Sequence, residues 1–189
     1  MNCSRPIVGS VLALLLSAAA TLARADDVAE VTQLVKAGQA SEAMTRLDQF
    51  LAARPKDPQL RFLKGLLLAD SGRAADAMHV YALLNEDYPE LPEPYNNLAV
   101  LHAGQGDFDK ARTALEAAVR GNPRYATAWE NLGDVQARLA ARAYARALAL
   151  DATNAALPPK IERLGTLFTT KPLAAAQAPP GPASRPASP

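Results

Sequence analysis

A period of 34 residues runs through the middle of this chain of 189 residues. Three residue types mark the period independently, because glycines, alanines and prolines all recur at the same spacing. Such regularity predicts a supersecondary unit that is repeated along the chain, each copy burying one face against the next. The recurring positions are Gly38, Gly72 and Gly106; Ala43, Ala77 and Ala111; and Pro55, Pro89 and Pro123.

These positions fit a pair of antiparallel helices in each unit. The glycine takes a turn position that a side chain would obstruct. The alanine lets the two helices approach closely, and the proline stops the second helix. We therefore expect helices at about 27–37, 40–53, 58–71, 74–87, 92–105 and 108–121.

The pattern resembles the tetratricopeptide repeat, whose mark is Trp-x2-Leu-Gly-x2-Tyr, then Ala-x3-Phe, then Pro. The resemblance implies an all-α fold: a right-handed superhelical α-solenoid with about three full repeats and a shortened fourth. The repeats would span about 26–57, 58–91, 92–125 and 126–154. The matching residues include Gly65, Tyr81, Tyr95, Leu98, Ala99, His102, Leu115, Trp129, Leu132 and Gly133.

The last unit departs from the pattern. From Asp134 to Asp151 there is neither glycine nor proline, and apolar residues recur at helical spacing. This predicts one long bent helix or, as the less favoured alternative, two helices joined by a tight turn. A further apolar stripe at 158–169 is typical of a helix that caps the last repeat. A membrane-surface helix is disfavoured there because the segment is short and weakly basic.

Both ends of the chain differ from the repeats in composition. Residues 1–25 resemble a cleaved secretory signal, with Arg5 before an apolar run that ends in Ala23-Arg24-Ala25. This predicts a periplasmic domain at 26–170, and an uncleaved signal that anchors the chain in a membrane is the alternative. The proline- and alanine-rich residues 171–189 predict a disordered tail.

Composition argues against several classes of function. All the acidic residues lie at or after Asp26, so the expected domain is mildly acidic and unsuited to nucleic acid or anionic lipid. The two histidines are far apart and Cys3 lies in the expected signal. We therefore expect no enzyme activity, no metal, no cofactor and no membrane insertion after signal cleavage.

The resemblance also implies a concave groove that binds peptides along the first helix of each repeat. By position in the repeat, the groove would grade from apolar to amide to acidic side chains. Such a surface suits an extended peptide with an apolar anchor at one end and Lys or Arg at the other. The predicted groove residues are Phe62, Leu66, Asn96, Asn97, Val100, Glu130, Asn131 and Asp134.

Two alternatives about this groove stay open at this stage. Asn97 and Asn131 either bind a ligand's backbone, since one amide donates and accepts, or bond within their own repeats. Phe62 and Leu66 either line the groove or are partly buried against the first repeat. A clamp for C-terminal carboxylates is disfavoured, because its basic positions carry Phe62, Asn96 and Glu130.

The leading hypothesis is a non-catalytic protein–protein interaction scaffold in the bacterial cell envelope, with a protein or peptide partner. One alternative is a structural self-association module, for example a homodimer. The other is an accessory regulator of an envelope enzyme that acts on peptidoglycan or in assembly, which rests on analogy of fold.

Overall fold

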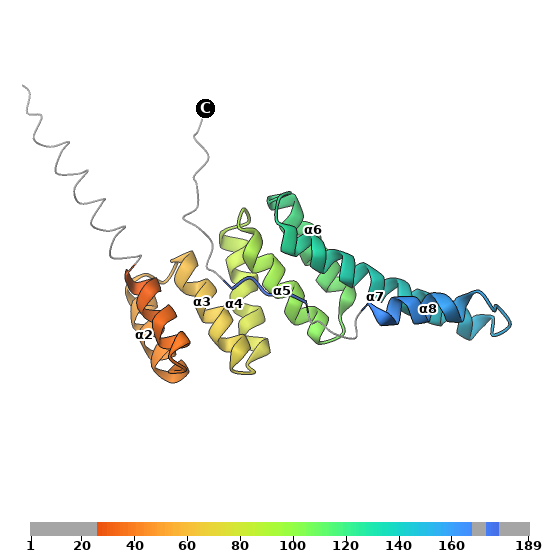
Figure 1. Cartoon of the computed structure of the whole chain (residues 1–189). Helices are drawn as coiled ribbons and strands as arrows, with labels where there is room; N and C mark the ends of the chain where they lie inside the picture. The colour runs from red at the N-terminus through yellow and green to blue at the C-terminus, as the bar shows by residue number, and fades with distance from the viewer. Residues whose placement is uncertain (1–25, 168–172, 178–189) are drawn as a thin grey trace, which may run out of the picture. The chain divides into compact units, whose positions relative to one another are not determined.

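The computed structural model describes residues 26–167 and 173–177 (Figure 1). The predicted signal at 1–25 lies outside the described residues. Those that are described form helices joined by short turns, plus one extended segment at 173–177, and contain no strand. They divide between Leu60 and Arg61 into two compact units, which are taken separately below.

The first unit contains a helical hairpin. Residues 26–36 form its first helix and α2 (Ala40–Ala53) its second. An ion pair between Arg46 and Glu30, 2.6 Å apart, joins the two helices. The buried side chains of the hairpin are Val31, Ala43 and Leu47.

The second unit repeats this arrangement. Consecutive helices pack on each other from α4 to α8, so each helix is held mainly by its neighbours in the chain. A continuous apolar core of alanine, leucine and valine side chains joins α5, α6 and α7. The helices are α3 (Pro58–Asp70), which begins at the end of the first unit, α4 (Ala74–Asp87), α5 (Pro92–Gly104), α6 (Phe108–Gly121), α7 (Ala126–Leu150) and α8 (Leu157–Thr166).

The three periodic glycines end the first helix of each pair. Gly38, Gly72 and Gly106 have φ of 75°, 75° and 78°, the left-handed conformation that favours glycine. Around Gly106, the N–H of Asp107 donates to the carbonyl of His102 at 2.9 Å, which completes a Schellman turn. A Cβ at these glycines would meet no atom within 4 Å. The turn position was predicted correctly, but backbone conformation and not steric obstruction explains it.

The shortened fourth unit is one continuous helix of 25 residues, α7, as the favoured alternative predicts. The helix α8 then packs against α7, with Leu157 buried at its start. Without glycine or proline after Asp134, nothing in the local sequence turns the chain before Leu150.

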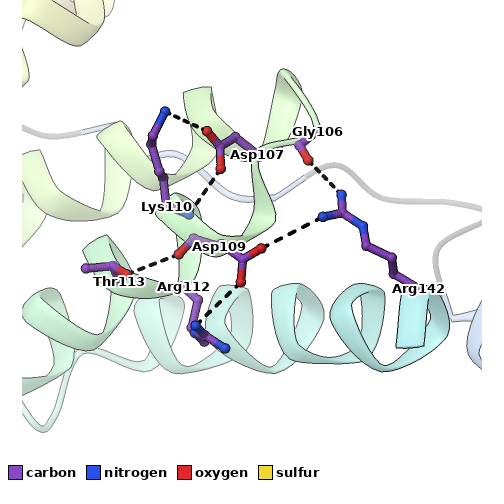
Figure 2. Close-up of polar contacts among 7 residues, drawn as sticks. All are labelled: Gly106, Asp107, Asp109, Lys110, Arg112, Thr113 and Arg142. Carbon is purple, nitrogen blue, oxygen red and sulfur yellow. Dashed lines mark hydrogen bonds and ion pairs between the residues drawn. The ribbon is translucent and has the colours of Figure 1, made fainter. Parts of the chain in front are cut away.

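A polar clamp holds the second half of α7 to the turn between α5 and α6 (Figure 2). Arg142 of α7 donates from Nη2 to the carbonyl of Gly106 at 2.9 Å, and its Nη1 lies 3.9 Å from Asp109 Oδ2. Its guanidinium also lies 5.2 Å from the centre of the Phe108 ring. The clamp therefore contacts α7 at the point where an ordinary repeat would begin a new helix.

Candidate binding site

Three asparagine side chains are buried next to one another on α5 and α7. Asn96 and Asn97 come from α5 and Asn131 comes from α7, with exposed fractions of 0%, 2% and 1%. Buried amides are costly unless they are hydrogen-bonded, so the partners of these three side chains define the site.

The main partner is a segment of the same chain, Leu173–Gln177, which lies extended across α5 (Figure 1). Asn131 binds both backbone polar groups of one residue in this segment. Its Nδ2 donates to the carbonyl of Ala174 at 2.8 Å, and its Oδ1 accepts from the N–H of Ala174 at 2.9 Å. One side-chain amide therefore holds one peptide residue with two hydrogen bonds.

Asn97 makes the same pair of bonds two residues further along the segment. Its Oδ1 accepts from the N–H of Ala176 at 2.6 Å, and its Nδ2 donates to the carbonyl of Ala176 at 3.2 Å. In an extended chain, alternate residues present their N–H and C=O groups to the same side. Asn97 and Asn131 are 34 residues apart and together bind the backbone of Ala176 and Ala174. We call this pair the asparagine ladder, with one step for each asparagine.

Asn96 connects the two steps of the asparagine ladder. Its Oδ1 accepts from Asn131 at 2.8 Å, and its Nδ2 donates to Asn97 Oδ1 at 3.3 Å and to the carbonyl of Ala174 at 3.0 Å. Because each amide orients the next, the three side chains are held ready for an extended backbone.

Tyr81 of α4 completes the network at the end that Asn97 occupies. Its hydroxyl accepts from Asn97 Nδ2 at 3.1 Å. The ring is 1% exposed, and burial raises the pKa of this hydroxyl well above its ordinary value, so it stays protonated. Gly65 makes room for the ring, since a Cβ there would lie 2.5 Å from Tyr81 Cε1. Sequence reasoning matched Tyr81 to the repeat but missed its contact with the asparagine ladder.

The segment is anchored by one larger apolar side chain. Leu173 is half-buried and packs against the core of α5, α6 and α7. Ala175 and Gln177 are exposed, whereas Ala174 and Ala176 are half-buried on the side of the asparagines. The bound segment therefore places small side chains at two alternate positions, next to an apolar anchor.

The predicted groove residues outside the asparagine ladder differ in how far they are buried. Phe62 was predicted to line the groove, which is wrong: it is 0% exposed and its ring packs 5.7 Å from that of Tyr81. Phe62 therefore offers no surface to a ligand, and Leu173 lies against the core of α5, α6 and α7. Leu66, Val100 and Asp134 are half-buried and Glu130 is exposed.

The prediction of a disordered tail from residue 171 is wrong for Leu173–Gln177. Composition counts apolar side chains available for burial, but this segment is held chiefly through its backbone by buried amides. Residues 171–172 and 178–189 lie outside the described residues.

Metal-binding clusters and membrane-spanning helices are not found among the described residues. Over 26–167 and 173–177, no group of three or more His, Cys, Asp or Glu could hold a metal ion. In the same ranges, no helix has the length and hydrophobicity needed to cross a bilayer. His102 is half-buried on α5, and burial lowers its pKa below the ordinary value.

The fold and site together define a class: an array of helical hairpins whose buried amides hold an extended backbone. A family model described as tetratricopeptide repeat matches residues 28–92 and 96–155, which is more than half of the chain. The chain therefore belongs to the tetratricopeptide repeat family. This repeat is generally a non-catalytic module for protein–protein interaction.

Several known proteins are similar to parts of the chain. The probable biofilm formation methyltransferase WspC of Pseudomonas putida is 32% identical over 93 residues, which cover 49% of this chain and 22% of WspC. The chloroplastic tetratricopeptide repeat protein PYG7 of Arabidopsis thaliana is 34% identical over 83 residues, 41% of this chain and 28% of PYG7. The chain thus spans under a third of either relative.

Among solved structures, the chain is similar to YrrB, described as a TPR protein with an unusual peptide-binding site. The TM-score is 0.51 at 26% identity, covering 55% of this chain and 54% of YrrB. A thermophilic TPR protein of Thermus thermophilus has a TM-score of 0.55 at 24% identity, covering 76% of this chain and 82% of that one. The second likeness concerns the fold alone.

Proposed function

We propose that this protein is a non-catalytic scaffold that binds an extended segment of a partner protein across Asn96, Asn97 and Asn131. One observation supports this most: each step of the asparagine ladder pairs with both the N–H and the C=O of one peptide residue. An arrangement that recognises a backbone in this way suits a peptide ligand better than a small metabolite.

The chemistry of the site narrows the class of ligand. Backbone recognition is largely independent of sequence, so selectivity would come from the half-buried positions. The segment now in the site carries Leu173 as anchor and alanines at the two ladder positions. The favoured partner therefore carries an apolar residue followed by small residues at alternate positions. The likeness to YrrB, itself a peptide-binding protein by its description, is consistent with this class.

We place the partner in the bacterial cell envelope. This part of the proposal rests on the signal-like residues 1–25, whose apolar run and small residues before Asp26 favour export. Homodimerisation and the regulation of an envelope enzyme are the competing roles. The similarity to WspC spans 22% of that methyltransferase and is too short to assign methyl transfer to this chain.

In-cell photo-crosslinking tests the proposal. A crosslinker at Val100, one turn beyond Asn96 and Asn97 on α5, is compared with one at the exposed His79 on α4. We expect a product from Val100 in the periplasmic fraction, heavier than the chain by the mass of a different protein. Replacing Asn97 and Asn131 together by Ala should reduce this product at least about tenfold, because several buried hydrogen bonds are lost.

Circular dichroism of the double variant serves as the control for folding. Equal products from Val100 and His79, or a product undiminished by the double substitution, would show that the partner binds elsewhere. A product with the mass of two copies of the chain would favour the self-association module.

A further inference from the structure

We propose that Leu173–Gln177 is a built-in competitor that closes the binding site until a partner peptide displaces it. This inference rests on the proposed function, because it assigns the occupant and the regulation of the same site. The physical reason is that the same buried amides cannot bind two backbones at once.

The hydrogen-bonding capacity of Asn97 is fully used in the closed state. Its two amide hydrogens go to Tyr81 and to the carbonyl of Ala176, and its oxygen accepts from Ala176 and Asn96. Asn131 likewise donates both amide hydrogens, to Asn96 and to the carbonyl of Ala174, and its oxygen accepts from the N–H of Ala174. A partner backbone can bind here only after Ala174 and Ala176 have left.

The connection to α8 makes the segment an effective competitor. Only residues 167–172 separate Leu173 from the end of α8 at Thr166. A short tether of this kind gives an effective concentration on the order of millimolar. A free peptide with an intrinsic Kd of about 100 μM would then bind roughly tenfold more weakly than to an open site.

The segment also buries little apolar surface, so a partner can displace it. It contributes one large apolar side chain, Leu173, and the ladder positions carry only methyl groups. Leu173 is half-buried, so it adds less than a fully buried leucine would. A partner with a larger apolar anchor and a similarly extended backbone would make the same hydrogen bonds and gain more burial.

The test uses the full-length protein and two proline substitutions. Ala174→Pro and Ala176→Pro together remove the two N–H groups that donate to the asparagine ladder. Ala175→Pro is the matched control, because the Ala175 side chain is exposed and its N–H lies between the two ladder bonds. A proline at 175 also favours extended backbone at Ala174.

The probe is a fluorescent synthetic peptide with the sequence of residues 170–180, followed by fluorescence anisotropy. We expect the double proline variant to bind it at least about tenfold more tightly than the wild type. Ala175→Pro should bind it as the wild type does. Adding Asn97→Ala and Asn131→Ala to the double proline variant should abolish the gain.

Several results would overturn the inference. Equal affinity of the wild type and the double proline variant would mean that the segment does not compete. If both then lose the peptide on substitution of Asn97 and Asn131, the proposed function stands and only the competitor fails. Peptide binding that survives those substitutions would overturn the proposed function itself.

Sedimentation of the wild type at the same concentrations distinguishes a segment bound within its own chain from one bound to a second copy. A monomer agrees with a segment bound within its own chain. A dimer that the double proline variant loses would place the segment in the site of a second copy and overturn closure within one chain.

Discussion

A side-chain amide carries the same donor and acceptor pair as a peptide unit, which explains why asparagine holds the extended segment. Aspartate in place of Asn97 would lack the donor and leave the carbonyl of Ala176 unpaired, at a cost of about 1–3 kcal/mol for a buried group. Aspartate in place of Asn131 would remove one of the two donors to the carbonyl of Ala174, the other being Asn96. The short side chains of Asn97 and Asn131 also favour binding. Their Cβ atoms are fixed by packed helices, so each amide loses few rotamers when it binds a backbone.

Gly65 and Gly133 occupy equivalent repeat positions but have different surroundings. A Cβ at Gly65 would overlap the Tyr81 ring, whereas one at Gly133 would meet no atom within 4 Å. We expect Gly65→Ala to lower the free energy of unfolding by about 1–3 kcal/mol, since the ring must shift within a packed core. Urea unfolding, followed by circular dichroism, measures this change.

Gly133→Ala is the control and should have the opposite sign. It adds a methyl group to an open helical position of α7, which stabilises a helix by roughly 0.5–1 kcal/mol. Equal effects of Gly65→Ala and Gly133→Ala would show that the fit of Tyr81 against Gly65 is unimportant.

Residue roles were predictable only in part. The repeat period identified Asn97 and Asn131, but neither open alternative describes their contacts. Each amide binds Leu173–Gln177 of the same chain, and each donates to a side chain of the preceding repeat, Tyr81 for Asn97 and Asn96 for Asn131. Phe62 was misassigned because its equivalent position in the next repeat is Asn96, and position alone does not show that an aromatic side chain will turn into the core against Tyr81.

At the scale of elements, the clamp by Arg142 adds to the stability of α7 where it extends beyond an ordinary repeat helix. We expect Arg142→Ala to increase hydrogen exchange in residues 139–150 of α7, because the free energy needed to open this part of the helix falls by about 1 kcal/mol. The estimate is modest because Arg142 and Asp109 are more than half exposed, where an ion pair and a cation–π contact each contribute up to about 1 kcal/mol.

Arg112→Ala provides the comparison for this clamp. Arg112 pairs with Asp109 and Glu116 within α6 (Figure 2 shows the pair with Asp109), so its loss should leave exchange in α7 unchanged. If both variants changed exchange in α7 equally, the local ion pairs and not the clamp would stabilise the helix.

Most element boundaries followed from the sequence because strong local signals agree with the repeat. The glycines of positive φ end the first helices, and observed helices such as α2 and α6 have the predicted limits. The segment Leu173–Gln177 could not be predicted in this way. Its extended conformation depends on contacts with Asn97 and Asn131, which are distant in the sequence. The local sequence of the segment does not predict these contacts.

For the whole molecule, the second unit combines a binding site and an occupant in one chain. A repeat array is stabilised by contacts between neighbours, so the site on α5 and α7 does not need the segment in order to fold. The family, supported by the match to residues 28–92 and 96–155, makes a protein partner the natural ligand. The pairing of Ala174 and Ala176 with the asparagine ladder is the central claim, because both proposals depend on it.

Hydrogen exchange of individual backbone amides in the full-length protein, followed by NMR, tests this claim most directly. The N–H groups of Ala174 and Ala176 donate to buried amide oxygens, so we expect them to exchange at least about tenfold more slowly than those of Ala175 and Gln177. This difference should vanish when Asn97 and Asn131 are both replaced by Ala. Exchange of all four amides at the rate of an unstructured peptide would contradict the account.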